Sequence, residues 1–340
     1  MGAKWIEGAS AFAMTLGVLL GTAAAADEPF YKGKQVNLII GLNPGGGYDV
    51  YARLLARHWG KHLLGNPQIV ARTMHGAGSR IAAGHMYNVA PRDGLTVSAV
   101  VNGLPFEPLF TEEKLTFDPT KFTWVGNINK EVNLLVVSRR SEVTSMEDLL
   151  AGKHLVVASS GGAGSANTMP RILNTLLDTK VKIIARYKSA ADGFLAMQRG
   201  EVDGRGMYWS SLLATQKNLY ERGELRILVQ IGLEKHPDLR DVPLALEMAK
   251  TPEDRQLMEL LFASLTIGRP VLAPPGLSAE RTAELQRSFD AAVADPELLA
   301  EAHKIGIEVT PMSGPSVAAI INELYKTPAY IVARAKTLWN

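Results

Sequence analysis

The chain of 340 residues contains no cysteine. A disulfide framework, a thiol nucleophile, an all-cysteine zinc site and a cysteine-held iron–sulfur cluster are therefore excluded. An excess of charge of one sign is missing as well, because 36 Lys and Arg residues stand against 34 Asp and Glu residues. Since no basic block stands out either, the sequence gives no reason to expect a nucleic acid or an anionic membrane surface as a partner.

A short apolar run lies near the N-terminus. Residues 9–20, "ASAFAMTLGVLL", carry no charge, follow Lys4, and lead into "GTAAAA" before Asp27. A basic start, a short apolar run and a small-residue exit are typical of a secretory signal peptide. The run is shorter than the ~20 residues that span a bilayer, which disfavours an uncleaved anchor. We therefore predict a signal peptide over residues 1–26, cleavage after Ala26, and a soluble periplasmic protein.

Apolar, β-branched runs alternate with helical segments through the next two thirds of the chain. The alternation predicts the α/β class with largely parallel sheets, and the region from Pro252 onward is mostly helical. Tyr51, Leu55 and Trp59 recur every four residues and predict a helix face packed on a sheet. Seven or more strands over roughly 310 residues indicate two α/β lobes rather than one sheet. The predicted strands cover residues 36–40, 68–72, 95–101, 133–138, 154–159, 181–187 and 225–231.

Three glycine-rich junctions each follow a predicted strand. They read "NPGGGYD" (43–49), "MHGAGSR" (74–80) and "SSGGAGSAN" (159–167). Glycines between a strand and a helix let the backbone approach a ligand, and the exposed N–H groups of the first helical turn bind anions. One such turn would be an ordinary strand–helix connection, but three together favour a shared anion-binding cleft.

None of these junctions matches a nucleotide-binding or catalytic motif. Residues 41–48 have the glycine spacing of a P-loop but lack its Lys and its Ser or Thr. No G-x-G-x-x-G and no G-x-S-x-G is completed. His58 and His62 are four residues apart but lack the Glu of H-E-x-x-H and a third ligand. We therefore predict no cofactor and no metal.

Several motifs, taken in order, resemble a receptor family. "PGGGYDVYARLLARHWGKHL", "GAGS", "YNVAPRDG", "SSGGAGS", "RYKSAADGFLAMQRGEVDG" and "HPDLRDVPLALEM" are similar to the Bug-type solute receptors of tripartite tricarboxylate transporters, the TctC-like family. The resemblance implies a two-lobe periplasmic binding fold of type II, with two crossings between the lobes. Such a protein closes on a small organic carboxylate and delivers it to membrane permease subunits. The implied lobes are residues 27–130 plus 230–340 and residues 131–229, in a protein that we expect to be a monomer.

Carried over by position, the resemblance places the ligand on three loops and one strand end. The loops fall on residues 43–49, 76–79 and 160–167, and the last cleft strand is expected to end near Asp203. Departures from the family pattern at His75 and in "GRGMYWSS" touch the cleft, so the resemblance does not name the ligand. The expected ligand-binding residues are Asn43, Gly45, Gly46, Gly47, Tyr48, Asp49, Ala77, Gly78, Ser79, Ser160, Gly162, Gly164, Ser165, Asn167, Asp203 and Trp209.

Two alternatives stay open from the sequence. A secreted hydrolase or lyase of the same fold would need a base beside a nucleophile, with Asp49, Asp203, Ser79, Ser165 and His75 as candidates. Asp49 also has two interpretations. It shapes the glycine turn from the first turn of a helix, which we favour, or it selects ligands by accepting a hydrogen bond and repelling an extra carboxylate.

Overall fold

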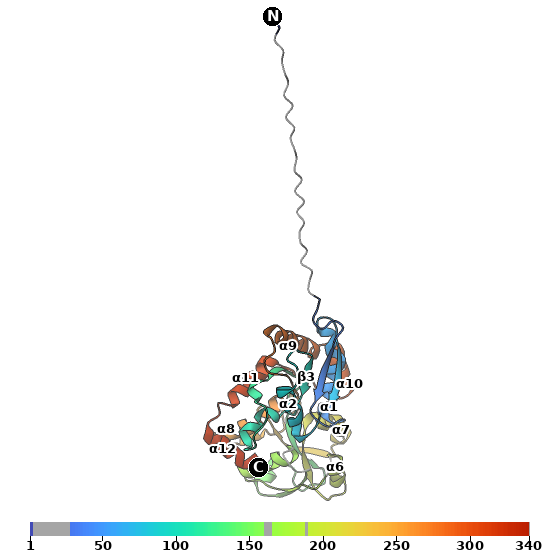
Figure 1. Cartoon of the computed structure of the whole chain (residues 1–340). Coiled ribbons are helices and arrows are strands. Elements are labelled where there is room, and N and C mark those ends of the chain that lie inside the picture. Colours follow the sequence, from blue (N-terminus) through green and yellow to red (C-terminus); the bar gives the residue numbers. More distant parts are fainter. Residues whose placement is uncertain (3–27, 160–164, 188–189, 340) are drawn as a thin grey trace.

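The computed structural model describes residues 1–2, 28–159, 165–187 and 190–339, and its strands form two sheets (Figure 1). The predicted cleavage site after Ala26 lies outside the described residues. Sheet A contains β1 (Gln35–Ile40), β2 (Gln68–Thr73), β3 (Thr96–Ala99), β4 (Thr123–Asn127), β10 (Pro270–Ala273) and β11 (Met312–Ser313), in the order β11-β4-β10-β3-β1-β2. Sheet B contains β5 (Asn133–Ser138), β6 (His154–Ala158), β7 (Lys180–Ile184), β8 (Gly204–Tyr208) and β9 (Leu225–Ile231), in the order β7-β6-β8-β5-β9.

Helices pack around both sheets. The α-helices are α1 (Gly47–Trp59), α2 (Arg80–Asn88), α3 (Glu107–Phe110), α4 (Met146–Leu150), α5 (Ser165–Leu177), α6 (Ala190–Gln198), α7 (Trp209–Glu221), α8 (Pro252–Thr266), α9 (Ala279–Val293), α10 (Pro296–Lys304), α11 (Gly314–Leu324) and α12 (Ala329–Trp339). Short 3₁₀ turns are η1 (Gly60–His62), η2 (Ala77–Ser79), η3 (Leu104–Phe106), η4 (Pro119–Lys121), η5 (Pro237–Leu239) and η6 (Ala245–Met248). The last helix, α12, packs against α8 and α3 and also against α5, which follows a strand of sheet B.

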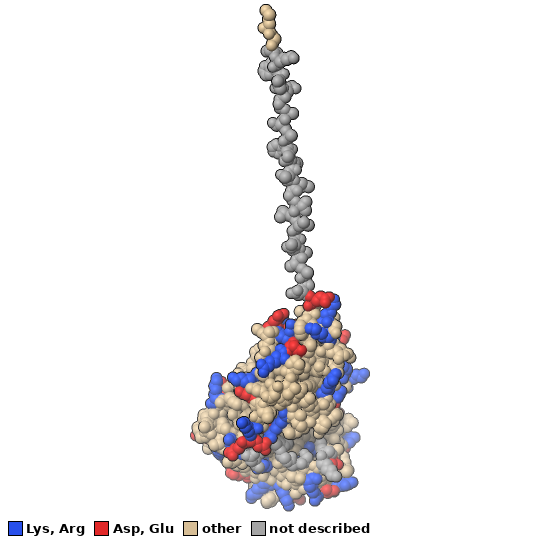
Figure 2. Space-filling model, viewed as in Figure 1, with Lys and Arg blue, Asp and Glu red and all other residues tan. Residues whose placement is uncertain are grey.

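The described helices contain no membrane-spanning segment, and the visible face mixes charges of both signs (Figure 2). In the part of the chain that the structure describes, every helix is too short or too polar to cross a bilayer. Figure 2 shows Lys and Arg interspersed with Asp and Glu over the visible face, in line with the formal net charge of +2.

The chain passes between the two sheets twice. It leaves sheet A after β4 and enters sheet B with β5, and it returns to sheet A after β9. The α/β class and the two crossings are therefore as the sequence predicts.

The prediction of largely parallel sheets is wrong in part, because both sheets are mixed. The strands β1, β2 and β3 are parallel, as are β6, β7 and β8. In contrast, β10 is antiparallel to β3 and β4, and β5 is antiparallel to β8 and β9. Both β5 and β10 follow a crossing, so they run away from the edge where the lobes meet. Their neighbours run toward that edge, which therefore collects the carboxyl ends of β1, β2, β3, β6 and β8.

Helix α1 buries the face that the sequence predicts. Tyr51, Leu55 and Trp59 are at most 1% exposed. The Nε1 of Trp59 donates to the Oγ of Ser288 at 2.9 Å, and its ring meets that of Phe289 edge-on at 5.9 Å between centroids. Truncating a buried aromatic side chain of this kind to Ala typically costs about 3–5 kcal/mol. This packing fixes α1 against α9, and so fixes where the first turn of α1 lies.

Strand β8 was missed from the sequence because glycine weakens the strand pattern. A Cβ added at Gly204 would lie 2.3 Å from the carbonyl oxygen of Val136, and one added at Gly206 would lie 3.0 Å from the Cα of Ala166. The neighbouring strand β5 and helix α5 approach β8 more closely than side chains allow. The glycines therefore bring the N-terminus of α5 beside β8.

We predict that Gly204→Ala destabilises the protein by about 1–3 kcal/mol, because a backbone oxygen must move to admit the methyl group. Urea unfolding measures the change. Gly103→Ala is the matched control, since Gly103 has helical dihedral angles and an added Cβ there meets no atom within 4 Å. Equal stability of the two variants would show that β8 tolerates a side chain at this position.

Candidate functional site

The predicted loops lie at the edge of sheet A where the lobes meet. Residues 43–49 connect β1 to α1, and residues 76–79 connect β2 to α2. In α/β sheets, ligands bind outside the carboxyl ends of the strands, where connections diverge. Of the third loop, Ser160, Gly162 and Gly164 lie outside the described residues. Ser165 and Asn167 lie half-buried in the first turn of α5.

Helix α1 begins with an uncapped turn. Its N-cap is Gly46, which makes no side-chain capping hydrogen bond, and residues 43–47 are exposed. Gly45 has φ of 79°, a left-handed conformation that glycine adopts readily. The first N–H groups of a helix have no partner within it, so those of Gly47 and Tyr48 are available to an anion at the positive end of the helix dipole.

Asp49 holds this turn in shape. Its Oδ2 accepts the N–H of Gly45 at 3.0 Å, and its Oδ1 accepts the Nε–H of Arg53 at 2.8 Å. Burial alone would raise the pKa of Asp49, but the hydrogen bonds from Arg53 and Gly45 outweigh it and lower that pKa below its ordinary value. The geometry agrees with the interpretation of Asp49 as a shaping residue. It also shows that the Gly45 amide, which we expected to bind ligand, already has a partner.

The loop before α2 has an unusual backbone. Ala77, Gly78 and Ser79 have φ of 44°, 61° and 72°, and the left-handed region costs a non-glycine residue roughly 1–2 kcal/mol. The Oγ of Ser79 is buried, donates to the carbonyl of Gly41 at 3.1 Å and accepts the N–H of Val101 at 3.0 Å. Ser79 therefore ties the ends of β1 and β3 together, while Ala77 and Gly78 expose their backbone.

A network of polar side chains beside α1 reaches the other lobe. The hydroxyl of Tyr48 donates to the Oδ1 of Asn102 at 2.9 Å and accepts the Asn102 N–H at 3.1 Å. The Nδ2 of Asn102 donates to the carbonyl of Ser264 at 3.0 Å. At the end of β8, the hydroxyl of Tyr208 lies near Ser165 and Asn102. Asn102 is thus the central member of the network, although the sequence analysis did not single it out.

The two tyrosines of this network stay neutral. Burial raises the pKa of Tyr48 and that of Tyr208, although Arg269 acts in the opposite direction on both. Each hydroxyl therefore remains a hydrogen-bond donor and acceptor at neutral pH.

A buried ion pair lies behind Tyr48. The side chains of Arg269 and Glu131 are 3% and 1% exposed, and the Nη2 of Arg269 lies 2.8 Å from the Oε1 of Glu131. Ser210, in the first turn of α7, donates to the same Oε1 at 2.5 Å and accepts from Arg269 at 3.3 Å. The guanidinium carbon lies 4.2 Å from the ring centroid of Tyr48 and 5.6 Å from that of Tyr208. The pair therefore contacts the predicted anion loop and both lobes.

Trp209 lies away from the network of Tyr48 and Asn102. Trp209 is 4% exposed, and its Nε1 donates to the Oε1 of Glu308 at 3.2 Å. Its ring packs on that of His236 at 5.8 Å. His236, Glu308 and Glu131 line a cavity of about 880 Å³ whose lining does not include Tyr48 or Asn102. The geometry therefore gives no support to a ligand contact by Trp209.

Asp203 precedes β8 rather than ending a strand, so the expectation of a strand end at this residue is wrong. Its Oδ2 accepts the N–H of Val156 at 2.8 Å, which links β8 to β6. A five-residue strand spans about 16 Å, which separates Asp203 from Tyr208 at the interlobe end of β8. "GEVD" reads as the end of a strand only because the glycines that follow it hide β8.

The residues that an enzyme would need are engaged elsewhere. The Oγ of Ser79 is bonded to two backbone groups, Asp49 is bonded to Arg53, and Asp203 is bonded to a backbone amide. Among the described residues, these candidates form no pair of nucleophile and base, which acyl or phosphoryl transfer by such groups would require.

Two groups of side chains have the composition of a metal site but are already paired. In one, Lys61 lies 2.6 Å from both Asp295 and Glu297 and forms an ion pair with each. In the other, the Nδ1 of His236 accepts the N–H of Asp238 at 3.2 Å, which leaves the ring proton on Nε2 toward Glu308. A metal would have to displace these partners. The two groups are His58, Asp295 and Glu297, and His236, Asp238 and Glu308.

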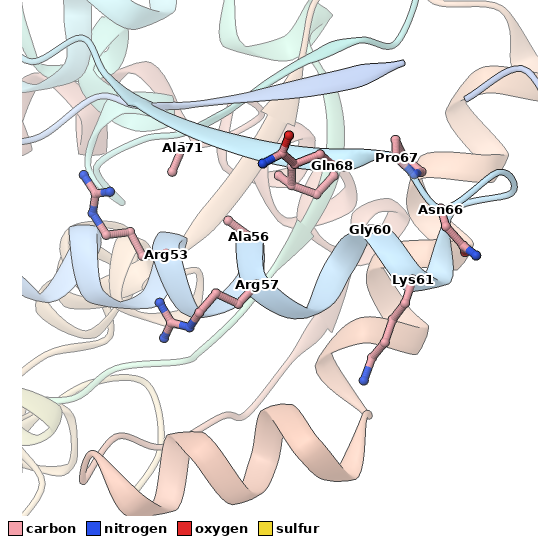
Figure 3. A pocket seen from close by; sticks show the side chains of 10 residues that line it. Arg53, Ala56, Arg57, Gly60, Lys61, Asn66, Pro67, Gln68 and Ala71 are labelled. Carbon is pink, nitrogen blue, oxygen red and sulfur yellow. The ribbon is translucent and has the colours of Figure 1, made fainter. Parts of the chain in front are cut away.

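A pocket of about 600 Å³ lies between α1 and the edge strand β2 (Figure 3). Arg53 and Arg57 line it from successive turns of α1, and Lys61 lines it from η1. Arg53 is paired with Asp49, Arg57 with Glu301 at 2.5 Å, and Lys61 with acids that precede and begin α10. The charges of this basic row are therefore used to hold α1 and its neighbours, and the pocket is not the predicted anion site.

Comparisons with known proteins bear on the family and the fold of the chain. The model of the tripartite tricarboxylate transporter family receptor matches residues 51–336. A UPF0065 protein of Cupriavidus necator, encoded in the 5′ region of gbd, is 25% identical over 343 residues, which cover 96% of this chain and 95% of that protein.

Solved structures share the fold. A TctC solute-binding protein from Polaromonas, without ligand, has a TM-score of 0.68 at 19% identity, covering 91% of this chain and 98% of its own. MatC from Rhodopseudomonas palustris, with bound malate, has a TM-score of 0.62 at 20% identity, covering 90% of this chain and 99% of its own. The predicted two-lobe fold is therefore confirmed.

We predict that Asp49→Asn lowers the free energy of unfolding by about 1–2 kcal/mol at neutral pH, because two charge-assisted hydrogen bonds are weakened. Since folding lowers the pKa of Asp49, its contribution is present above the ordinary value of 3.8 and is lost as the pH falls through the folded-state pKa. Urea unfolding of both proteins at neutral and at acidic pH measures the difference. Equal stability at neutral pH, or a difference that persists in acid, would contradict the shaping role.

Proposed function

The chain belongs to the tripartite tricarboxylate transporter receptor family, and from this we propose that it captures a small organic carboxylate between its lobes and presents it to membrane permease subunits. It is a solute-binding receptor rather than an enzyme, so the hydrolase or lyase alternative is set aside. A related structure holds malate, a dicarboxylate, which supports a ligand of this class.

The uncapped first turn of α1, facing the Tyr208–Ser165 end of the other lobe, is the observation that carries this proposal. One carboxylate would accept the N–H groups of Gly47 and Tyr48. The far end of the ligand would meet Ser165 and the first turn of α5. Charge-assisted hydrogen bonds contribute roughly 1.5–3 kcal/mol each, and micromolar affinity corresponds to about 8 kcal/mol after the cost of ordering both partners is subtracted. With that cost included, about four to six such bonds are enough.

Closure would be a hinge motion about the two crossings. We assign residues 27–130 and 230–340 to the lobe of sheet A, and residues 131–229 to the lobe of sheet B. The contacts from Tyr208 to Asn102 and from Ser210 to Arg269 join the lobes and would form on closure. A monomer in this closed form is what the permease subunits would recognise.

We predict that a carboxylate in a thermal-shift screen stabilises the mature protein. At about 100 times its dissociation constant, a ligand that binds only the folded state adds ~2.7 kcal/mol, which raises the melting temperature by several degrees. The screen covers mono-, di- and tricarboxylates, with the corresponding amides as controls. A melting temperature unmoved by every acid would overturn the proposed function.

Two further measurements sharpen this screen. Nuclear magnetic resonance of the bound acid after prolonged incubation should show it unchanged, and a new product would revive the enzyme alternative. Asp49→Asn should keep the ranking of ligands, because the residue shapes the turn. A gain for more highly charged acids would instead make Asp49 a selector.

We predict that the periplasmic form of the protein begins at Asp27, because the Ala-rich exit fits cleavage after Ala26. Intact-mass measurement of periplasmic material tests this expectation. A mass that retains residues 1–26 would show an anchored protein instead.

A further inference from the structure

The guanidinium of Arg269 lies against the turn that is proposed to hold the carboxylate. A Cβ added at Gly47 would lie 3.4 Å from the Nη2 of Arg269, and the ring of Tyr48 covers the guanidinium at 4.2 Å. The exposed amides of α1 and this buried cation are therefore separated by little more than one layer of backbone. A charge at this distance acts on an anion at the turn without touching it.

Glu131 lies on the other side of Arg269. Its carboxylate is bonded to Ser210, and its Cγ packs against Gly268, where an added Cβ would lie 2.5 Å away. Of the two partners, Arg269 is the nearer to the turn. Its Nη2 would lie 3.4 Å from a Cβ at Gly47, whereas no atom of Glu131 lies within 4 Å of that position. An anion at the turn would therefore meet the positive partner first, with Glu131 behind it reducing the attraction.

The guanidinium is not saturated by its partners. Its Nη1 donates to the carbonyl of Gly268 at 2.9 Å, and its Nη2 is shared between Glu131 and Ser210. The buried Nε–H has no hydrogen-bond partner among the described residues. The positive partner of this pair therefore has one donor left unused by the described residues and lies under the ring of Tyr48.

We propose that Arg269 and Glu131 set the charge selectivity of the cleft, Arg269 favouring dicarboxylates over monocarboxylates and Glu131 limiting that preference. This inference rests on the proposed function. In this arrangement neither residue would touch the ligand. Both would act through the field in the cleft, because the guanidinium lies under Tyr48 at the first turn of α1 and 5.6 Å from the ring of Tyr208, beside the Ser165 end where a second carboxylate would lie.

The size of the effect follows from Coulomb's law. Removing one negative charge ~10 Å from a ligand carboxylate, at an effective dielectric constant of ~20–40, changes the affinity by about 4- to 17-fold for each ligand charge. The monoester lacks the second carboxylate, so Glu131→Gln should raise the affinity for the dicarboxylate by about that factor more than the affinity for its monoester.

The probes are succinate, malate and adipate, each with its monomethyl ester, measured by calorimetry at pH about 7.5, where all free carboxylates are ionised. The readout is the ratio of the two affinities within each pair. A merely structural effect on the cleft would lower both affinities alike and leave this ratio unchanged. Glu284→Gln is the matched control. It removes a carboxylate that is 10% exposed and paired with Arg281, packed beside Tyr31 and so at the opposite end of β1 from the cleft.

A second variant guards against misfolding, because a buried cation without its partner is strongly destabilising. Glu131→Gln combined with Arg269→Met removes both charges, which is often close to neutral for stability. The double variant should prefer dicarboxylates less than the wild type does. The ratio of dicarboxylate affinity to monoester affinity should be highest for Glu131→Gln, intermediate and equal for the wild type and Glu284→Gln, and lowest for the double variant.

Each outcome separates the two proposals. A wild type that binds succinate or another probe, with the same ratio in all variants, overturns the charge pair as a selector and leaves the receptor function standing. A wild type that binds none of the six probes contradicts the proposed ligand class, and the selector falls with it. If Glu131→Gln does not fold, a double variant whose ratio equals or exceeds that of the wild type overturns the inference.

Discussion

The buried ion pair between Arg269 and Glu131 is the contact on which the arrangement of the cleft depends. Arg269 precedes β10 and Glu131 lies in the first crossing, so the pair stands where the two sheets exchange the chain. It holds Ser210 of α7 on one side and Tyr48 of α1 on the other. Removing one partner of such a pair typically costs about 3–5 kcal/mol, because the remaining charge is buried alone. The relative position of α1 and α7 therefore follows from one interaction that both lobes share.

The local parts of this design could be predicted from the sequence. Strand β1, the glycine turn and α1 form one continuous pattern, since period-two apolar residues give way to three glycines and then to apolar residues every four positions. The acid in the first turn could be assigned a shaping role for the same reason, because Asp49 acts on Gly45 and Arg53, four residues to either side. Interactions of this range depend on neighbours in the chain, which the sequence displays directly.

The long-range parts could not be predicted in the same way. Strand β8 has the sequence "GRGMY". Its glycines are required by the close approach of Val136 and Ala166, residues that lie far away in the chain. Asn102 carries no motif, yet it joins Tyr48 to Tyr208 because β3 and β8 end at the same edge. The antiparallel direction of β5 and β10 likewise follows from the crossings and from nothing within the strands. The contacts that could not be predicted are therefore those between residues that meet only in the folded arrangement of the two lobes.

Asp49 can stand beside the proposed anion site because its charge is neutralised within α1, by Arg53. One carboxylate oxygen of Asp49 accepts a hydrogen bond from Arg53, whose charge neutralises it, and the other accepts the N–H of Gly45. The cation that serves the turn is Arg269, which reaches α1 from the opposite side, beneath Tyr48. A carboxylate bound at the amides of Gly47 and Tyr48 would then meet exposed donors in front and a buried positive charge behind. The acid fixes the shape of the turn, and its own charge is cancelled before it can act on a ligand.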